Sequence, residues 1–284
     1  RYKLNKVLII GASGFLGSYC FNKFSEDNQL EVEGTRNSGL NKNLSKIDYT
    51  DSFAFSDFIN KSRPNYIVWC AGLKKLSLTE KDLELARKQN FYPIKTIVNY
   101  QKDHKDVFLI FISTDYVFNG LKGNYKTLDT VNPSTNYGKS KVLAENYIIE
   151  KSPNFSILRA GAIIGPGSVF LNWLVDKIKS NETIELYDNF FTPTPIKNIF
   201  KAIKIIINFS KNGIYHVSGK QKLSRYEFGI LVKKHFKSSS SELIEVKSSN
   251  NDLNLLKDLS LINSKEFEKF ESIEKYISKA LKHD

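Results

Sequence analysis

The feature that most constrains this chain is a short apolar run that leads directly into a glycine-rich turn and then into a helical pattern. The run 7–10 has the character of a buried strand, and glycines follow at positions 11, 14 and 17. Gly11 allows a tight turn, Gly14 lets a diphosphate approach the main chain, and Gly17 permits close packing of the helix. The N–H groups that open this helix would face the phosphates. The predicted dinucleotide-binding loop consists of Gly11, Ser13, Gly14, Phe15, Leu16 and Gly17.

Beyond this unit, short β-branched runs alternate with longer helical patterns, which is typical of a parallel sheet with crossover helices. The predicted strands are 6–10, 30–34, 65–70, 107–113 and 155–158, with a further short strand at 43–47 and a late one at 214–217. The predicted crossover helices are 15–24, 52–61, 80–100 and 137–150. We therefore expect an α/β fold with a doubly wound, parallel, Rossmann-type sheet.

The alternation becomes irregular after residue 160, which indicates a second, smaller lobe. A helix is expected at 171–180, a proline-containing stretch follows at 190–195, and an amphipathic helix is expected at 265–282. We predict a dinucleotide-binding Rossmann domain at 1–160, to which 194–217 returns, and a mainly substrate-binding C-terminal lobe at 161–284.

Residues after the second and third predicted strands indicate which dinucleotide would bind. Arg36 follows the strand 30–34, where it can pair with a 2′-phosphate through charge-assisted hydrogen bonds, so NADP(H) is favoured and NAD(H) is left possible. Glu33 lies close enough in sequence to blur this preference. Asp48 could meet the adenine edge or serve as a helix N-cap. Ala71 and Gly72, after the strand 65–70, are assigned to the same cofactor site.

The residues with the clearest chemical character are Thr114, at the end of a buried strand, and the pair Tyr137 and Lys141 at the start of a helix. Four residues apart on a helix, the phenol and the ammonium are neighbours. The cation favours the ionised phenol and so lowers a pKa that is otherwise near ~10. This set predicts proton exchange with a bound substrate.

Composition narrows the remaining classes of function. The net charge of +12 fits an anionic small substrate, and without a run of basic residues it does not indicate nucleic-acid binding. The two cysteines form no C-x-x-C pair and the four histidines have no metal-ligand spacing, so neither a disulfide framework nor a metal site is expected. No apolar run approaches the roughly 20 residues of a membrane helix, and no signal peptide is visible. A cytoplasmic protein is expected; a homodimer is left open.

These motifs together resemble the extended short-chain dehydrogenase/reductases of the NAD-dependent epimerase/dehydratase superfamily, and within them the dTDP-4-dehydrorhamnose reductase family. The stretch 113–118, Ser-Thr-Asp-Tyr-Val-Phe, is the part specific to that family. The other matching segments are the glycine loop 11–17, Asn-Tyr-Gly-Lys-Ser-Lys at 136–141, Ile-Leu-Arg at 157–159, Thr-Pro-Thr at 192–194 and Gly-Ile-Tyr-His-Val-Ser-Gly at 213–219.

The resemblance implies a role for each matching residue. Tyr137 would be the proton donor, Lys141 would lower its pKa and hold the nicotinamide ribose, and Thr114 would hydrogen-bond the substrate oxygen. Asp115 and Tyr116 would contact the substrate as well, and Asn90 matches a structural asparagine of the family. The implied activity is NADP-dependent reduction of a nucleotide-linked 4-keto sugar, in the biosynthesis of activated sugars and polysaccharides.

Two departures from the family pattern leave the substrate open. Ala160-Gly161-Ala162 stands where the family usually has a tryptophan shortly after its Leu-Arg, and 70–75, with Lys74 and Lys75, replaces an alanine-rich, acidic segment. One alternative is an NAD-dependent nucleotide-sugar epimerase or dehydratase, against which Arg36 argues. Another is a non-catalytic dinucleotide-binding subunit, because the regulatory subunit of methionine adenosyltransferase resembles the same reductases.

Overall fold

The computed structural model describes residues 4–248 and 256–281, and the chain within it forms two compact units. The first unit takes in the chain up to Val117, Thr135–Leu158 and Ile203–Ile214. The second takes in Phe118–Ser134, Arg159–Ala202 and the chain from Tyr215 onward. Within the second unit, Phe118–Ser134 hydrogen-bonds with residues near 260, far away in the sequence.

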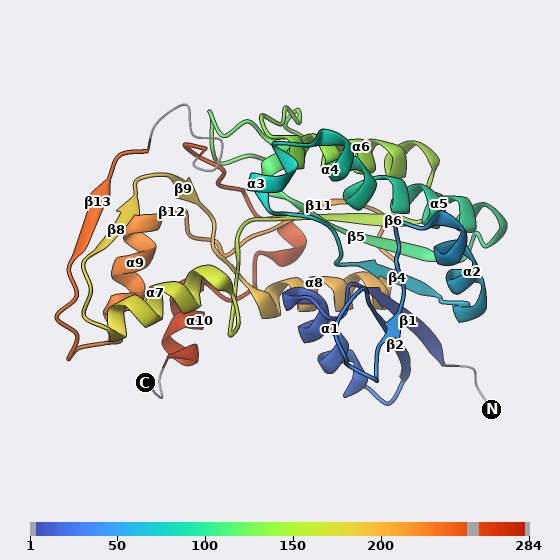
Figure 1. Cartoon of the computed structure of the whole chain (residues 1–284), viewed down its shortest axis with the longest axis horizontal. Coiled ribbons are helices and arrows are strands. Elements are labelled where there is room, and N and C mark those ends of the chain that lie inside the picture. Colours follow the sequence, from blue (N-terminus) through green and yellow to red (C-terminus); the bar gives the residue numbers. More distant parts are fainter. Residues whose placement is uncertain (1–3, 249–255, 282–284) are drawn as a thin grey trace. The chain divides into compact units, whose positions relative to one another are not determined.

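A seven-stranded sheet lies at the centre of the first unit (Figure 1), with the strand order β11-β6-β5-β4-β1-β2-β3. Along the chain its strands are β1 (Asn5–Ile10), β2 (Leu30–Arg36), β3 (Ser45–Lys46), β4 (Tyr66–Trp69), β5 (Phe108–Thr114), β6 (Phe155–Ala160) and β11 (Gly213–Val217). β1 pairs in parallel with β2 and β4, and β4 pairs in parallel with β5. The strand order therefore runs outward from β1 in two directions, which confirms the predicted doubly wound Rossmann-type α/β fold.

Helices cover both faces of this sheet (Figure 1). α2 (Ser52–Ser62), α5 (Tyr92–Asp103) and α6 (Asn136–Lys151) pack on one face, where their apolar side chains share a buried cluster with residues of β1, β4 and β5. α1 (Phe15–Ser25) and the C-terminal half of α8 (Ile196–Phe209) lie on the other face. The central strands β1, β4 and β5, covered on both sides, are accordingly buried along most of their length.

The single long helix predicted at 80–100 is wrong: this segment forms two shorter helices, α4 (Leu83–Asn90) and α5, which Phe91 separates. The short helix α3 (Leu76–Thr79) precedes them. The reason is local. Pro93 lies in the first turn of α5, and proline can neither donate the hydrogen bond that would continue α4 nor fit beside its last turn. Asp82 opens α4 independently by accepting a 2.9 Å hydrogen bond from the Leu85 N–H.

The second unit is built from small two-stranded sheets and short helices. β7 (Ile163–Ile164) pairs with β10 (Thr194–Pro195), β8 (Ile184–Tyr187) with β13 (Leu243–Val246), and β9 (Phe190–Phe191) with β12 (Leu223–Ser224). Its helices are α7 (Val169–Lys179), the start of α8, α9 (Arg225–Lys233) and α10 (Ile273–Ala280). The single closing helix predicted at 265–282 is wrong. Lys265–Phe267 form one 3₁₀ turn, and Ser272 caps a separate helix, α10; Lys282 lies outside the described residues.

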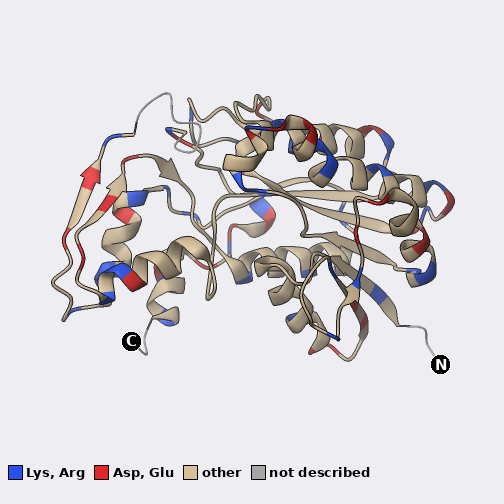
Figure 2. Ribbon diagram, viewed as in Figure 1, with Lys and Arg blue, Asp and Glu red and all other residues tan. Residues whose placement is uncertain are grey.

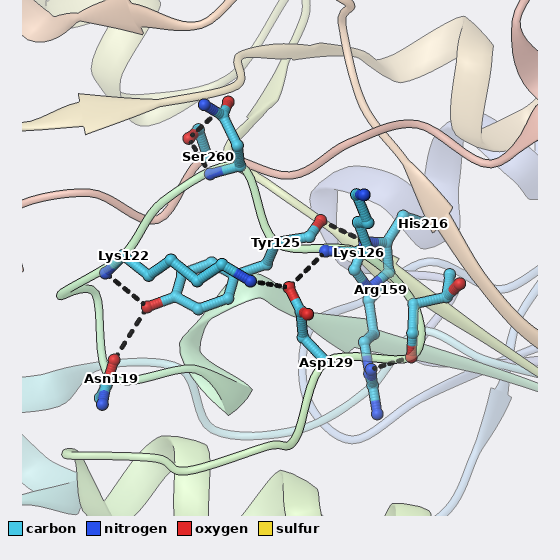
Figure 3. A network of polar contacts seen from close by, with 10 residues as sticks. Asn119, Lys122, Tyr125, Lys126, Asp129, Arg159, His216 and Ser260 are labelled. Atoms are coloured by element: carbon cyan, nitrogen blue, oxygen red, sulfur yellow. Dashed lines mark hydrogen bonds and ion pairs between the residues drawn. The ribbon is translucent and has the colours of Figure 1, made fainter.

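Two of the family-matching motifs meet inside the second unit (Figure 3). The His216 ring is fully buried, and its Nδ1 lies 3.1 Å from the Tyr125 carbonyl oxygen. Burial, together with the nearby Arg159 guanidinium, lowers the pKa of His216 to about 4. Arg159 in turn donates to the Thr127 carbonyl oxygen at 3.4 Å. His216 is therefore a neutral structural histidine that holds the segment after Phe118.

The distribution of charge and the composition of the helices describe the surface of each unit. Figure 2 shows basic positions interspersed with acidic ones along the helices of each unit. Among residues 4–248 and 256–281, no helix combines the length and apolar character that a membrane span requires. The same residues contain no cluster of His, Cys, Asp and Glu that could hold a metal ion.

Candidate active site

The glycine loop between β1 and α1 has the geometry of a phosphate cradle. Gly11 has a φ of +86°, and the Gly14 N–H donates a 3.0 Å hydrogen bond to its carbonyl oxygen. A Cβ atom on Gly17 would lie 2.1 Å from that same oxygen, so only glycine lets α1 approach β1 this closely. Gly14 is the exposed N-cap of α1 and offers no side-chain cap. The first N–H groups of the helix are thus left for an anionic ligand.

A buried threonine fixes the start of this loop, and the sequence analysis missed it. The Gly11 N–H donates a 3.0 Å hydrogen bond to the hydroxyl of Thr35, which comes from β2 and is 1% exposed. Thr35 thereby links the glycine loop to the neighbouring strand. The feature of the sequence that could have identified Thr35 is a small hydroxyl residue directly before Arg36 at the end of a predicted strand.

Arg36 lies at the end of β2, held by the loop that follows it. Its guanidinium donates to the carbonyl oxygens of Asn41, at 2.9 Å, and Gly39, at 2.6 Å. These bonds use two of the five guanidinium donors, which leaves others for a phosphate. Glu33 does not compete for Arg36, because its carboxylate binds the Lys6 ammonium at 2.9 Å and accepts from the Ser62 hydroxyl at 2.6 Å.

Asp48 is exposed and shapes a turn after β3. Its carboxylate accepts from both the N–H and the hydroxyl of Thr50, at 2.9 and 2.7 Å. The alternative of Asp48 as the N-cap of a helix is wrong, since Asp51 caps α2 by accepting from the N–H groups of Phe53 and Ala54. The role of Asp48 at an adenine edge stays a prediction.

The segment after β4 crosses the glycine loop and is tied to α6. A Cβ atom on Gly11 would lie 2.9 Å from Ala71, so the two segments are in direct contact. The Asn90 side-chain amide accepts from the Leu73 N–H at 2.8 Å and donates to the hydroxyl of Ser140 at 2.9 Å. Asn90 is fully buried. It therefore fixes the position of the Ala71–Gly72 segment relative to the helix that carries Tyr137, a structural role like the one the resemblance implied.

Thr114, Asp115 and Tyr116 form the end of β5 and the 3₁₀ turn Asp115–Val117. The Thr114 hydroxyl donates to the Asp115 carboxylate at 3.0 Å and accepts from the Tyr116 N–H at 3.2 Å. The Tyr116 ring packs edge-on against that of Tyr137, with 5.9 Å between centroids. These contacts gather the predicted substrate residues around one phenol.

Tyr137 is positioned by capping groups at the start of α6 that the sequence analysis did not identify. The Thr135 hydroxyl accepts from the Gly138 N–H at 2.9 Å, and the Glu80 carboxylate accepts from the Asn136 N–H at 2.8 and 3.0 Å. The Glu80 carboxylate also lies 3.4 Å from the Tyr137 nitrogen. A carboxylate at this end of a helix is favoured by the helix dipole as well.

Burial raises the pKa of the Tyr137 phenol, and the nearby charge of Asp115 acts in the same direction. A hydrogen bond with Thr114 partly opposes this rise by favouring the phenolate. The phenol therefore holds its proton at neutral pH, as a proton donor must. Lys141 is not among the groups that shift the pKa of Tyr137 in the structure, so the lowering by Lys141 stays a prediction for the cofactor-bound state.

Lys141 is 4% exposed and lies against β5. Its ammonium donates a 2.6 Å hydrogen bond to the Ile112 carbonyl oxygen and lies 4.0 Å from the centre of the Phe111 ring. Burial lowers the pKa of Lys141 to about 7, while Glu145 and Cys70 oppose this shift. The two cysteines, Cys20 and Cys70, lie 50 positions apart in the sequence. The Cys70 thiol in fact hydrogen-bonds with Cys20, whose pKa rises well above its usual value.

Comparison with known proteins identifies the family. A 32% identical crystal structure, a hypothetical dTDP-4-dehydrorhamnose reductase from Sulfolobus tokodaii, superimposes with a TM-score of 0.84 over 94% of this chain and 95% of its own. The dTDP-4-dehydrorhamnose reductase of Aggregatibacter actinomycetemcomitans is 29% identical over 236 residues, which are 80% of this chain and 78% of that protein. The methionine adenosyltransferase 2 subunit beta of Danio rerio is 27% identical over 258 residues, 84% of this chain and 76% of that protein. The family model described as RmlD substrate binding domain matches residues 5–267, and the chain therefore belongs to this family.

Proposed function

We propose that this protein reduces the keto group of a nucleotide-linked 4-keto sugar with NADPH, in the cytoplasm. The observation that carries the proposal is the grouping of Thr114, Tyr137 and Lys141 along β5 and α6, in the unit that also holds the glycine loop. The similarity to dTDP-4-dehydrorhamnose reductases supports the class of substrate.

The residues of the first unit fit a phosphorylated dinucleotide. Gly14 at the start of the cradle is exposed and has no side chain, the N-terminus of α1 has no side-chain cap, and Arg36 keeps free donors for a 2′-phosphate. The cofactor-binding residues we propose are Gly11, Ser13, Gly14, Phe15, Leu16, Gly17, Arg36, Asp48, Ala71, Gly72, Tyr137 and Lys141.

The cofactor supplies the hydride when it is bound, and the chain controls the proton. The protonated phenol of Tyr137 donates to the sugar oxygen as that oxygen gains negative charge. The resulting phenolate is stabilised by the Lys141 ammonium, and by the Thr114 hydroxyl once its single proton turns from the Asp115 carboxylate to the phenolate. Thr114, Asp115 and Tyr116 orient the sugar oxygen, while the basic net charge of the chain suits the diphosphate of the substrate.

The test is to mix the protein with NADPH and a panel of nucleotide-linked 4-keto sugars and to follow the absorbance of the reduced cofactor. Stoichiometric consumption of NADPH supports the reductase. Product formation without net consumption, with cofactor copurifying, refutes it in favour of an epimerase or dehydratase. Light scattering on the same sample tests the homodimer.

A regulatory subunit is the second candidate, favoured by the similarity to methionine adenosyltransferase 2 subunit beta. On this alternative the chain binds a dinucleotide without turning it over and alters the activity of a catalytic partner. Titrating the protein into a methionine adenosyltransferase assay separates the two functions. A saturable change in that activity, with no NADPH consumption on any keto sugar, supports the subunit.

A further inference from the structure

Three residues of α6 form a stripe that faces β5, and the proposed function uses only two of them. Tyr137, Lys141 and Glu145 follow one another at four-residue spacing, which places them on one face of the helix. Glu145 is 1% exposed, although a carboxylate is rarely buried unless it is paired. Its burial beside an ammonium therefore requires an explanation.

The stripe meets consecutive residues of β5 through polar contacts. The Ser113 hydroxyl donates a 2.5 Å hydrogen bond to the Glu145 carboxylate, and the Lys141 ammonium donates to the Ile112 carbonyl oxygen at 2.6 Å. The Thr114 hydroxyl hydrogen-bonds with Tyr137. Each residue of the stripe is thus matched to one residue of 112–114, which fixes the helix against the strand.

We propose that Glu145 is a positioning residue that acts through Lys141: its buried carboxylate, fixed by the Ser113 hydroxyl, keeps the neighbouring ammonium charged and in place beside Tyr137. Charge balance is the physical reason. A buried ammonium that lacks an opposite charge loses its proton at neutral pH, and a neutral amine could stabilise neither a phenolate nor an anionic cofactor.

The groups that face Lys141 can be named. Glu145 comes from its own helix, one turn further on, and the Cys70 thiol comes from the residue that directly follows β4. From β5, the Phe111 ring and the Ile112 carbonyl oxygen contact the ammonium without titrating. The Glu145 carboxylate is the only one of these groups that is ordinarily an anion at neutral pH.

The inference rests on the proposed function only in giving Lys141 a role at the cofactor site, so its test needs neither cofactor nor substrate. The protonation midpoint of Lys141 is followed by NMR in full-length protein with ¹³C-labelled lysine side chains. The Lys141→Arg variant assigns the resonance. Replacing Glu145 by Gln removes the charge and keeps an oxygen that can accept from Ser113, and we expect the midpoint to fall by about one pH unit or more.

Two matched controls isolate the buried carboxylate. Glu150→Gln makes the same substitution at an exposed position of the same helix, and Cys70→Ser removes the other titratable neighbour contributed by a different element. Neither should move the midpoint as far as Glu145→Gln does. An equal shift in Glu150→Gln, or an unchanged midpoint in folded Glu145→Gln, overturns the inference.

If Glu145→Gln does not fold, the Ser113→Ala variant tests whether the buried carboxylate keeps Lys141 charged. Removing the hydroxyl deprives the buried carboxylate of its hydrogen bond and makes it easier to protonate, so the Lys141 midpoint should fall, by less than in Glu145→Gln. No fall in this variant refutes the role of the pair. A fall in a protein that consumes no NADPH would leave this inference intact while refuting the reductase.

Discussion

The Lys141 ammonium donates its 2.6 Å hydrogen bond to the main-chain oxygen of Ile112, two residues before Thr114. A main-chain acceptor cannot be removed by mutation and cannot change its charge. The ammonium is therefore anchored to β5, while its protonation depends on the burial and the side chains around it.

The affinity for NADPH should depend on pH above neutrality. The pKa of Lys141 is about 7 in the free protein, and an anionic ligand favours the ammonium, so the pKa rises on binding. Between these two pKa values binding takes up a proton, and Kd should increase by up to tenfold per pH unit. Below pH 7 this group should contribute no dependence. Fluorescence titrations from pH 6 to 9 measure the effect, and Lys141→Arg should flatten it.

The phenol oxygen of Tyr137 should be required for turnover but not for cofactor binding. Tyr137→Phe is expected to lower kcat by roughly 100-fold or more, because the proton donor is lost. Its Kd for NADPH should stay close to that of the unmodified protein. Tyr147→Phe, on the same helix, is the matched control and should keep full activity. An unchanged kcat in Tyr137→Phe would remove the role assigned to the phenol.

Two glycines of the cofactor loop should respond differently to alanine. At Gly17 the added Cβ would lie 2.1 Å from the Gly11 oxygen, so Gly17→Ala should lower the free energy of unfolding by about 1–3 kcal/mol. At Gly14 the nearest atom, the Gly11 oxygen, is 3.3 Å away and φ is −82°, so alanine needs only a small local shift and should destabilise the fold much less than at Gly17. Gly14→Ala should instead weaken NADPH binding, since the new methyl group obstructs the diphosphate. Chemical denaturation and NADPH titration of both variants test the contrast.

Replacing Arg36 should change the choice between dinucleotides. Arg36→Ala is expected to weaken the binding of NADPH by roughly 10- to 100-fold, because one charge-assisted hydrogen bond contributes about that much to affinity. The affinity for NADH should change little. Arg36→Lys should recover part of the affinity, because it restores the charge without the planar guanidinium. Parallel Kd measurements with both dinucleotides decide the point. An equal loss of both would refute the contact with a 2′-phosphate.

Glu80 should stabilise the protein through the start of α6. Glu80→Ala leaves the Asn136 N–H without its acceptor, and we expect the free energy of unfolding to fall by about 1–2 kcal/mol. Lys81→Ala changes an exposed neighbour and should stay within about 0.5 kcal/mol of the unmodified protein. Urea denaturation of the two variants compares them. Equal stabilities would show that Thr135 alone caps the helix.

Local signals in the sequence were sufficient for the architecture of the first unit. The spacing of Gly11, Gly14 and Gly17 was sufficient to predict the loop, because the turn and the close approach of α1 depend on backbone geometry. The pair Tyr137 and Lys141 could likewise be found from helical periodicity. The break before α5 was equally local, and Pro93 should have indicated it.

The contacts that complete the candidate site come from residues far apart in the sequence. Glu80 caps a helix that begins at residue 136, Thr35 holds Gly11, and Ser113 binds Glu145. No periodicity connects the members of such pairs, because each contact exists only after the strands and helices have packed. The same holds for Cys20 and Cys70, which meet although 50 positions separate them.

The sequence by itself determined the fold class, and it singled out the glycine loop and the pair Tyr137 and Lys141 as candidates, because all three depend on short-range geometry. Only the tertiary structure decided the electrostatics of that pair. Burial raises the pKa of Tyr137 and lowers that of Lys141, and burial is a property of the packed sheet and helices. The order of residues shows that Lys141 follows Tyr137 by four positions on a helix. It does not show how far packing removes water from the two side chains.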